Sequence, residues 1–257
     1  MKIHLLGTFL LLLPLAVPAA ETTLPTPPEL KSAEAVIARW DFRDGKPDST
    51  DGKIAGVLRG PSTIVAAGNG HALKIASARG GAAAGLATAR IYPELTPGNA
   101  FKIMVSFYLN RPDGAGSAVL LDNKYVNMPK AGQEKYHRGY QINLYSNGAS
   151  YCIECFWGFG DKTANTASTR MPLAPNAWHT AAVEFTGQGQ VRYAIDGKDA
   201  GGGAVPAGSL AKPDNRLIIG DRVGNGYQPF PGLIGGVLIV DENTSSAKSE
   251  NQEGDLL

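Results

Sequence analysis

The stretch NAWHTAAVEFTGQGQVRYAIDGK, residues 176–198, decides the fold. Apolar side chains occupy every second position on both sides of its turn TGQGQ: Ala181, Val183 and Phe185 before the turn, and Val191, Tyr193 and Ile195 after it. A period of two places these side chains on one side of each strand, and a turn of this length is typical of a hairpin. The stretch therefore predicts two antiparallel strands with one buried face.

Two side chains at the start of this stretch could carry chemistry. Trp178 precedes the alternating run and His179 opens it. We expect Trp178 to cap the core at the entrance of the strand, and we expect His179 to be structural rather than catalytic.

The rest of the chain has the same character. Glycine accounts for 32 of 257 residues, about 12% against a usual value of about 7%. Short apolar runs are separated by Gly, Pro, Asn and Asp, and in FKIMVSFYLN every second side chain from Phe101 to Leu109 is apolar. This pattern is typical of antiparallel sandwiches rather than of alternating strands and helices. We therefore predict an all-β protein with a single antiparallel β-sandwich domain.

Changes in composition divide the chain into four segments. Residues 1–20 combine a basic start, an apolar core and the small residues VPAA, the layout of a secretory signal peptide. Residues 21–35 contain three prolines and predict a Pro-rich linker before the domain of residues 36–240. Residues 241–257 have five acids against Lys248 and predict a disordered acidic tail. We expect a secreted or periplasmic protein.

The net charge of the chain argues against some classes of binding partner. Lys2 is the only charged residue of residues 1–20, so the rest has 23 basic and 23 acidic residues. A net charge of zero, with no basic cluster along the sequence, argues against nucleic acid or an anionic membrane as partner. The apolar run of the signal is about a dozen residues, shorter than the ~20 that a membrane-spanning helix needs. We therefore do not expect the protein to span a membrane.

Three motifs carry a resemblance. The pattern W-H-x-x-A-V-x-F followed by Y-x-I-D-G, the segment LIIGDRVGNGYQPFPGLIGGVLIVD and the opening ARWDFRDGKPDSTDG together resemble the concanavalin A-like jelly roll of laminin-G and pentraxin type. The resemblance implies a jelly-roll sandwich of the lectin/glucanase kind. Where such domains usually read F-x-G-x-I-D, this chain has Gly235 in place of the carboxylate. The calcium site of the family is therefore not supported, no cofactor is expected, and the question of a metal stays open.

A second hairpin predicts the binding site. In RGYQINLYSNGASYCIECFWG, residues 138–158, the dipeptide Asn147-Gly148 predicts a two-residue turn that pairs Asn143 with Cys152 and Gln141 with Glu154. One face then carries apolar side chains, and the other carries Gln141, Asn143, Tyr145, Cys152, Glu154 and Phe156. Amides, a carboxylate and aromatic rings suit a sugar, so Gln141, Asn143, Tyr145, Glu154 and Phe156 are the predicted ligand-binding residues. The alternative is an ordinary solvated sheet face.

These residues favour a secreted, non-catalytic carbohydrate-binding or adhesion module with a polysaccharide or glycan as its ligand. The sequence contains no G-x-S-x-G, P-loop or HExxH motif. The alternative function is a polysaccharide lyase, or a glycoside hydrolase, that acts in the concave face of the jelly roll through His137, Gln141, Asn143 and Tyr227. The element YQIN weakly resembles the Q-I-H strand of alginate-lyase-like jelly rolls, which is why the lyase is kept. A purely structural envelope domain is the third possibility.

The spacing of the two cysteines shows whether a disulfide is compatible with a regular strand in the second hairpin. Cys152 and Cys155 are three residues apart, so in an extended strand their Cα atoms are about 10 Å apart. A disulfide requires a Cα separation of no more than about 7 Å. We therefore expect two free thiols.

Overall fold

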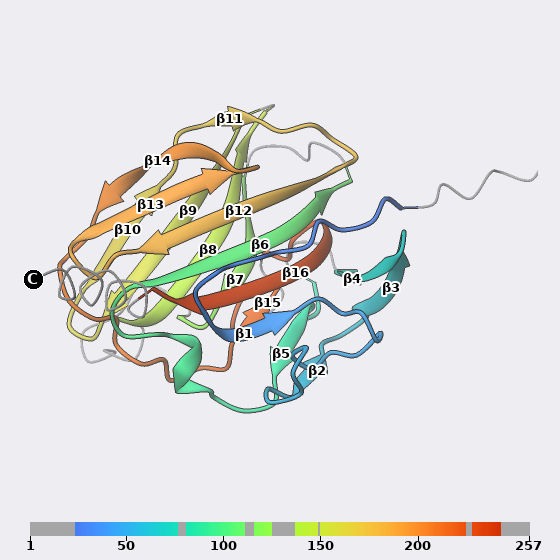
Figure 1. Ribbon diagram of the computed structural model, residues 1–257, viewed down its shortest axis with the longest axis horizontal. Coiled ribbons are helices and arrows are strands. Elements are labelled where there is room, and N and C mark those ends of the chain that lie inside the picture. Colours follow the sequence, from blue (N-terminus) through green and yellow to red (C-terminus); the bar gives the residue numbers. More distant parts are fainter. Residues whose placement is uncertain are drawn as a thin grey trace, which may run out of the picture.

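The computed structural model describes residues 24–76, 81–110, 116–124, 137–148, 150–224 and 228–242. Within these ranges the chain forms two antiparallel sheets that stack face to face (Figure 1). The single short 3-10 helix found there is η1 (Pro93–Leu95). No helix among these residues is long and apolar enough to cross a membrane. The prediction of an all-β antiparallel sandwich is confirmed.

Sheet A contains the hairpin of residues 176–198. Among the described residues its order is β14 (Lys198–Ala204), β13 (Gln190–Ile195), β12 (Ala177–Phe185), β6 (Phe101–Leu109), β16 (Gly232–Asp241), β4 (Gly70–Lys74) and β3 (Thr63–Ala67), with β1 (Ala35–Trp40) also paired to β16. Sheet B lies behind it in Figure 1 and contains the second hairpin. Its order is β10 (Thr163–Ala167), β9 (Ser150–Phe159), β8 (Arg138–Asn147), β7 (Gly116–Asp122), β15 (Ile218–Ile219), β5 (Leu86–Thr88) and β2 (Gly56–Leu58), with β11 (Met171–Pro172) on β9.

The core between the sheets is rich in aromatic side chains. Phe101 and Phe185 stack with their ring centroids 5.3 Å apart, and both are fully buried. A buried polar chain also joins the two sheets. The Trp157 indole donates to Thr166 Oγ1 at 2.7 Å, and Thr166 Oγ1 is hydrogen-bonded to the Tyr193 hydroxyl. Because Trp157 and Thr166 lie in sheet B and Tyr193 in sheet A, this chain fixes how the sheets sit on one another.

The buried side of each strand of the first hairpin is the predicted one. Ala181 pairs with Ile195, Val183 with Tyr193, and Phe185 with Val191, and all six side chains are buried in the core. The role expected for Trp178 is wrong. Alternation places Trp178 on the outer face of sheet A, where it packs against Tyr108 with ring centroids 5.3 Å apart. The residue at the core entrance is His179.

His179 is structural, as expected. Its side chain is 5% exposed. Nδ1 lies 2.8 Å from an Asp196 carboxylate oxygen and Nε2 lies 2.9 Å from the Ala174 carbonyl oxygen. Asp196 also accepts the Thr180 backbone N–H at 2.8 Å. Both ring nitrogens are therefore engaged in holding the end of the hairpin, and neither is available for catalysis.

Residues 24–34, the described part of the segment expected to be a linker that precedes β1, lie on the outer face of sheet A (Figure 1). The Trp178 indole donates to the Pro25 carbonyl oxygen at 2.7 Å, and Asn69 N–H donates to Thr26 Oγ1 at 3.0 Å. Leu30 is buried beside Leu238, Val240 and Met104, all side chains of sheet A. The folded unit therefore includes residues before position 36.

Gly235 explains why the carboxylate of the resembling domains is absent here. Gly235 sits at a β-bulge in the pairing of β16 with β6. A Cβ atom at this position would lie 2.6 Å from Pro27 Cβ, 2.6 Å from Ser106 Oγ and 2.8 Å from Trp178 Cζ3. The segment before β1 and the Trp178 ring occupy the space that an Asp side chain would need.

We predict that Gly235→Ala destabilises the protein by about 1–3 kcal/mol, because the added methyl group overpacks a site closed by backbone and an indole ring. The matched control is Gly98→Ala, where a Cβ atom would approach no closer than 3.5 Å. Urea unfolding of both variants measures the difference. Equal stability of the two variants would show that residues 25–30 do not pack on β16.

Candidate functional site

The second hairpin forms with a different turn from the one predicted. Asn147 pairs with Ser150, so Asn147 belongs to the strand pairing and not to the turn, and Gly148 has φ +65°. The observed pairs are Tyr145 with Cys152, Asn143 with Glu154 and Gln141 with Phe156, and the predicted pairs are wrong. The error is two residues along β9. Because side chains alternate with a period of two, it leaves every side chain on its predicted face.

The two faces of this hairpin differ as expected. The inward face is apolar and buried, with Tyr140, Ile142, Leu144, Tyr151, Ile153 and Cys155 in the core. The outward face, called the polar face below, carries Gln141, Asn143, Tyr145, Cys152, Glu154 and Phe156. All five predicted ligand-binding residues thus lie together on two neighbouring strands.

Burial on the polar face is graded. Gln141 and Asn143 are each 2% exposed, whereas Tyr145, Glu154 and Phe156 are half-buried. Gln141 Nε2 and Asn143 Oδ1 have no hydrogen-bond partner among the described residues. A buried amide without a partner costs about 1–3 kcal/mol. The centre of the polar face is therefore short of one hydrogen-bond acceptor and one donor.

Tyr145 brings a cation to the edge of the polar face. The Arg170 guanidinium lies over the Tyr145 ring, 4.9 Å from its centroid. Burial raises the pKa of the neighbouring Cys152 thiol, while Arg170 acts in the opposite direction. Cys152 and Cys155 are free thiols, as predicted. Both are buried, so Cys152 is less accessible to solvent than its position on the outward face of the hairpin suggests.

The residues of the lyase alternative are not brought together. His137 lies at the start of β8, where its carbonyl oxygen accepts the Gly160 N–H at 2.7 Å. It precedes Gln141 by four residues, a separation of about 13 Å along a strand. Tyr227 lies outside the described residues. The structure therefore groups Gln141 with Asn143 and leaves His137 at the end of the strand.

Sequence reasoning missed the charged end of the polar face. A β-bulge at Leu120 places both Leu120 and Leu121 toward the core and turns Asp122 outward, beside Gln141. Asp122 is fully buried and accepts the Lys124 N–H at 2.9 Å and the Val223 N–H at 2.8 Å. Burial lowers the pKa of Lys124, which is 4% exposed, and Asp122 acts in the opposite direction. Simple alternation along AVLLDN puts Asp122 on the wrong face, so no sequence signal marks it.

A cavity of about 370 Å³ lies on the opposite sheet, beneath residues 26–30. Its lining holds two acids, Glu29 and Asp41, and two arginines, Arg39 and Arg43. Arg43 Nε lies 2.9 Å from Asp41 Oδ2, and Arg43 Nη2 lies 3.4 Å from Glu29 Oε1. This cavity therefore has no excess of one charge. In the part of the chain that the structure describes, no group of three or more His, Cys, Asp or Glu side chains could hold a metal ion.

Known proteins resemble this chain in sequence family and in fold. Residues 80–248 match the family model of the concanavalin A-like lectin/glucanases superfamily. No curated protein sequence matches significantly. Domain 4 of a GH43 extracellular arabinanase from Geobacillus stearothermophilus, solved in complex with arabinotriose, is 14% identical with a TM-score of 0.56, over 81% of this chain and 93% of that one.

Two toxin domains have similar structures. The binding domain of Paraclostridial Mosquitocidal Protein 1 is 11% identical with a TM-score of 0.57, over 84% of this chain and 51% of that one. The receptor-binding domain of botulinum neurotoxin type G is 8% identical with a TM-score of 0.54, over 85% of this chain and 51% of that one. This chain spans about half the length of either toxin domain, and similarity at this level of identity shows the fold alone.

We predict that, in the native protein, Cys155 does not react with a thiol reagent and that Cys152 reacts more slowly than a free cysteine. Burial raises the pKa of both thiols, so less of each is in the reactive thiolate form at a given pH, and the rates rise as the pH rises. Timed alkylation followed by mass spectrometry measures both rates, with the denatured chain as the control. Rapid labelling of Cys155 in the native protein would contradict the packing of β9.

Proposed function

The chain belongs to the concanavalin A-like lectin/glucanase superfamily, and on that premise we propose that it is a non-catalytic carbohydrate-binding or adhesion module. Its ligand, a polysaccharide or glycan, lies on the polar face of sheet B. The proposed setting is the periplasm or the outside of the cell, which rests on the signal-like residues 1–20.

The observation that carries this proposal is the pair of buried amides. Gln141 Nε2 is a donor without an acceptor, and Asn143 Oδ1 is an acceptor without a donor, among the described residues. A sugar hydroxyl both accepts and donates a hydrogen bond. Hydroxyls of a bound glycan would satisfy both amides, and binding would remove a desolvation cost that the free protein bears.

The rest of the polar face suits the same ligand. Asn143 pairs with Glu154 and Gln141 pairs with Phe156 across the hairpin, so each amide has a neighbour about 5 Å away. Glu154 offers carboxylate oxygens as acceptors. The half-buried rings of Phe156 and Tyr145 offer flat apolar surfaces on which a sugar ring can lie.

Binding is favoured over catalysis by the separation of His137 from the amides. A general base must reach the proton that it removes within a hydrogen-bond distance, directly or through one water. His137 is about 13 Å along the strand from Gln141. The similar structures support the same proposal, since one is an arabinanase domain with arabinotriose bound and two are binding domains.

We predict that Gln141→Ala, Asn143→Ala and Glu154→Ala each weaken polysaccharide binding. Each lost hydrogen bond should cost about 0.5–1.5 kcal/mol, and up to ~3 kcal/mol at the charged Glu154. The melting temperature should fall least in Glu154→Ala, because Glu154 is half-buried whereas Gln141 and Asn143 are each 2% exposed. Thermal unfolding of all three variants separates a loss of binding from a loss of folding. Calorimetric titration with neutral and acidic polysaccharides measures the affinity.

The control is Gln190→Ala, an exposed glutamine at the start of β13 in sheet A, which should bind like the unmodified protein. Unchanged affinity in all three polar-face variants would refute the site. Release of unsaturated uronate products by the unmodified protein, abolished in His137→Ala, would replace the binding module with the lyase.

A further inference from the structure

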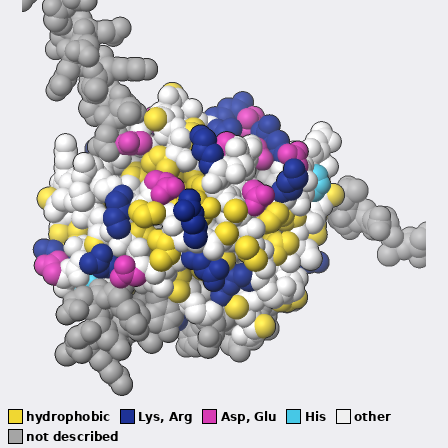
Figure 2. Space-filling view, turned by 90° about the horizontal axis from the view of Figure 1, so that it is seen from below, with side chains coloured by type: hydrophobic (Ala, Val, Ile, Leu, Met, Phe, Trp, Pro, Cys, Tyr) yellow, Lys and Arg dark blue, Asp and Glu magenta, His cyan; other side chains and the backbone are white. Residues whose placement is uncertain are grey.

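A cavity of about 500 Å³ opens at the other end of sheet B. Three arginines line it, and they come from three distant segments: Arg59 follows β2, Arg90 follows β5, and Arg216 precedes β15. Figure 2 shows Lys and Arg side chains gathered near the middle of the face on which η1, β2 and β5 lie. The cavity therefore concentrates positive charge in a protein whose net charge is close to zero.

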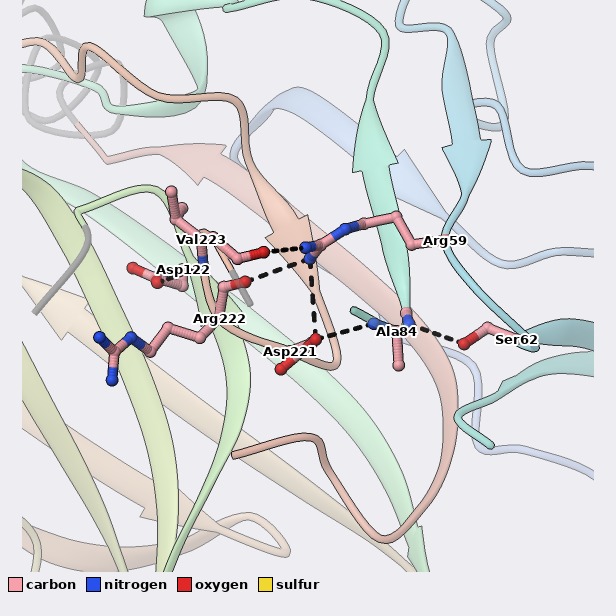
Figure 3. A network of polar contacts seen from close by, with 9 residues as sticks. Arg59, Ser62, Ala84, Asp122, Asp221, Arg222 and Val223 are labelled. Atoms are coloured by element: carbon pink, nitrogen blue, oxygen red, sulfur yellow. Dashed lines mark hydrogen bonds and ion pairs between the residues drawn. The ribbon is translucent and has the colours of Figure 1, made fainter. Parts of the chain in front are cut away.

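Arg59 is fixed in place before any ligand binds. Its guanidinium donates to the Arg222 carbonyl oxygen at 3.1 Å and to the Gly224 carbonyl oxygen at 2.8 Å. Figure 3 shows the Arg59 side chain reaching across to the loop that follows β15, while the Arg222 side chain points away from it. The Arg59 side chain is only 14% exposed. A charge held by backbone carbonyls in this way is preorganised for a ligand.

The positive charge of the cavity is not balanced by the acids near it. Asp214, the acid in its lining, is 3.6 Å from Arg138. Asp221 is fully buried behind Arg59, at 3.8 Å from Nη1, and it also accepts the Ala84 N–H at 2.8 Å. Burial is the largest cause that lowers the pKa of Arg59; the carboxylates of Asp221 and Asp122 act in the opposite direction, and the positive charge of Arg216 lowers the pKa further. Arg59 and Arg216 are therefore close enough to repel each other.

The other two arginines remain available. Arg90 and Arg216 are exposed and form no ion pair with any residue that the structure describes. Arg90 lies over the Tyr92 ring, 4.8 Å from its centroid. Stacking of this kind orients a guanidinium and leaves its edge N–H groups free to donate. An anion in the cavity would relieve the repulsion and accept these hydrogen bonds.

The cavity lies on the same side of sheet B as the polar face. Ile218 lines the cavity and pairs with Asp122, and Asp122 pairs with Gln141 on the next strand. Two strand spacings separate Ile218 from Gln141, about 10 Å. The loop that forms the cavity wall is also tied to the sheet, because the Val223 N–H donates to Asp122 at 2.8 Å. One extended ligand can therefore reach both places.

We propose that this arginine cavity binds the carboxylate or sulfate group of an acidic polysaccharide whose neighbouring sugars lie on the polar face. The inference rests on the proposed function and deepens it by naming the class of glycan. A carboxylate, which is planar, and a sulfate, which is tetrahedral, can each present two oxygens to the two parallel N–H groups of a guanidinium. Carboxylated and sulfated polysaccharides both carry such a group, so the test includes one polysaccharide of each kind.

The experiment measures binding of three polysaccharides at low and moderate salt: polygalacturonate for carboxylate, heparin for sulfate and arabinan as the neutral probe. The variants are Arg90→Gln, Arg216→Gln and the double variant, which leave Arg59 and its loop intact. The matched control is Arg192→Gln, whose side chain is 70% exposed and pairs with Glu184 in sheet A.

We expect the double variant to bind at least one acidic polysaccharide about 10- to 100-fold more weakly, because the charge-assisted hydrogen bonds of two guanidinium groups are replaced by weaker bonds from neutral amides. Its binding should also depend less on salt. Arabinan binding and the Arg192→Gln control should be unchanged. The inference would be overturned if the double variant bound polygalacturonate and heparin as tightly as the unmodified protein does. It would also be overturned if the unmodified protein bound arabinan more tightly than both acidic polysaccharides.

The same measurement separates this inference from the proposed function. If Gln141→Ala abolishes arabinan binding while the arginine variants bind the acidic polysaccharides normally, the proposed site on the polar face is supported and the arginine cavity is refuted. Acidic binding that depends on the arginines but not on Gln141 or Asn143 would keep the anion site and remove the polar face. If the unmodified protein binds none of the three polysaccharides, both are refuted.

Discussion

The pairing of β8 with β9 is the constraint on which the site depends. Every residue of these two long strands points either into the core or outward, because strand side chains alternate with a period of two. The inward set is anchored by Ile142, Leu144 and Ile153, all buried. A slip of one residue would bring Gln141 and Asn143 into the apolar core and expose that set. The stability of the sandwich thus fixes the position of the polar face.

This constraint also explains which features of the structure could be predicted from the sequence. The alternation in residues 176–198 is local, so the two strands and the buried side of each were predictable. The turn of the second hairpin was not, since Gly148 follows Asn147 and either residue can open a tight turn. Trp178 was assigned to the core from its size, although its position in the alternation puts it outside. Pattern was a better guide than side-chain type at that position.

The parts that could not be predicted are those that depend on contacts between distant segments. One extra residue at Leu120 turns Asp122 to the outer face, and nothing in the run AVLLDN indicates a bulge. Arg59, Arg90 and Arg216 are far apart in the sequence and meet only when β2, β5 and β15 are neighbours in sheet B. A charge count along the chain cannot detect such a group, which is why the composition showed no basic cluster.

The two outer faces of the sandwich have different roles because they are covered differently. On sheet A, Pro25 and Leu30 lie against the strands, and Gly235 provides the space that this packing needs. Arg43 is paired with Asp41 and Glu29 there, although Arg39 Nε and His71 Nδ1 have no hydrogen-bond partner among the described residues. On sheet B, the amides of Gln141 and Asn143 also lack partners among the described residues. Arg90 and Arg216 form no ion pair with a described residue, whereas Arg59 is close to Asp221. Unsatisfied polar groups cost folding free energy. On sheet B the two amides lie together on the face that the proposed glycan would contact, so binding there would recover part of this cost.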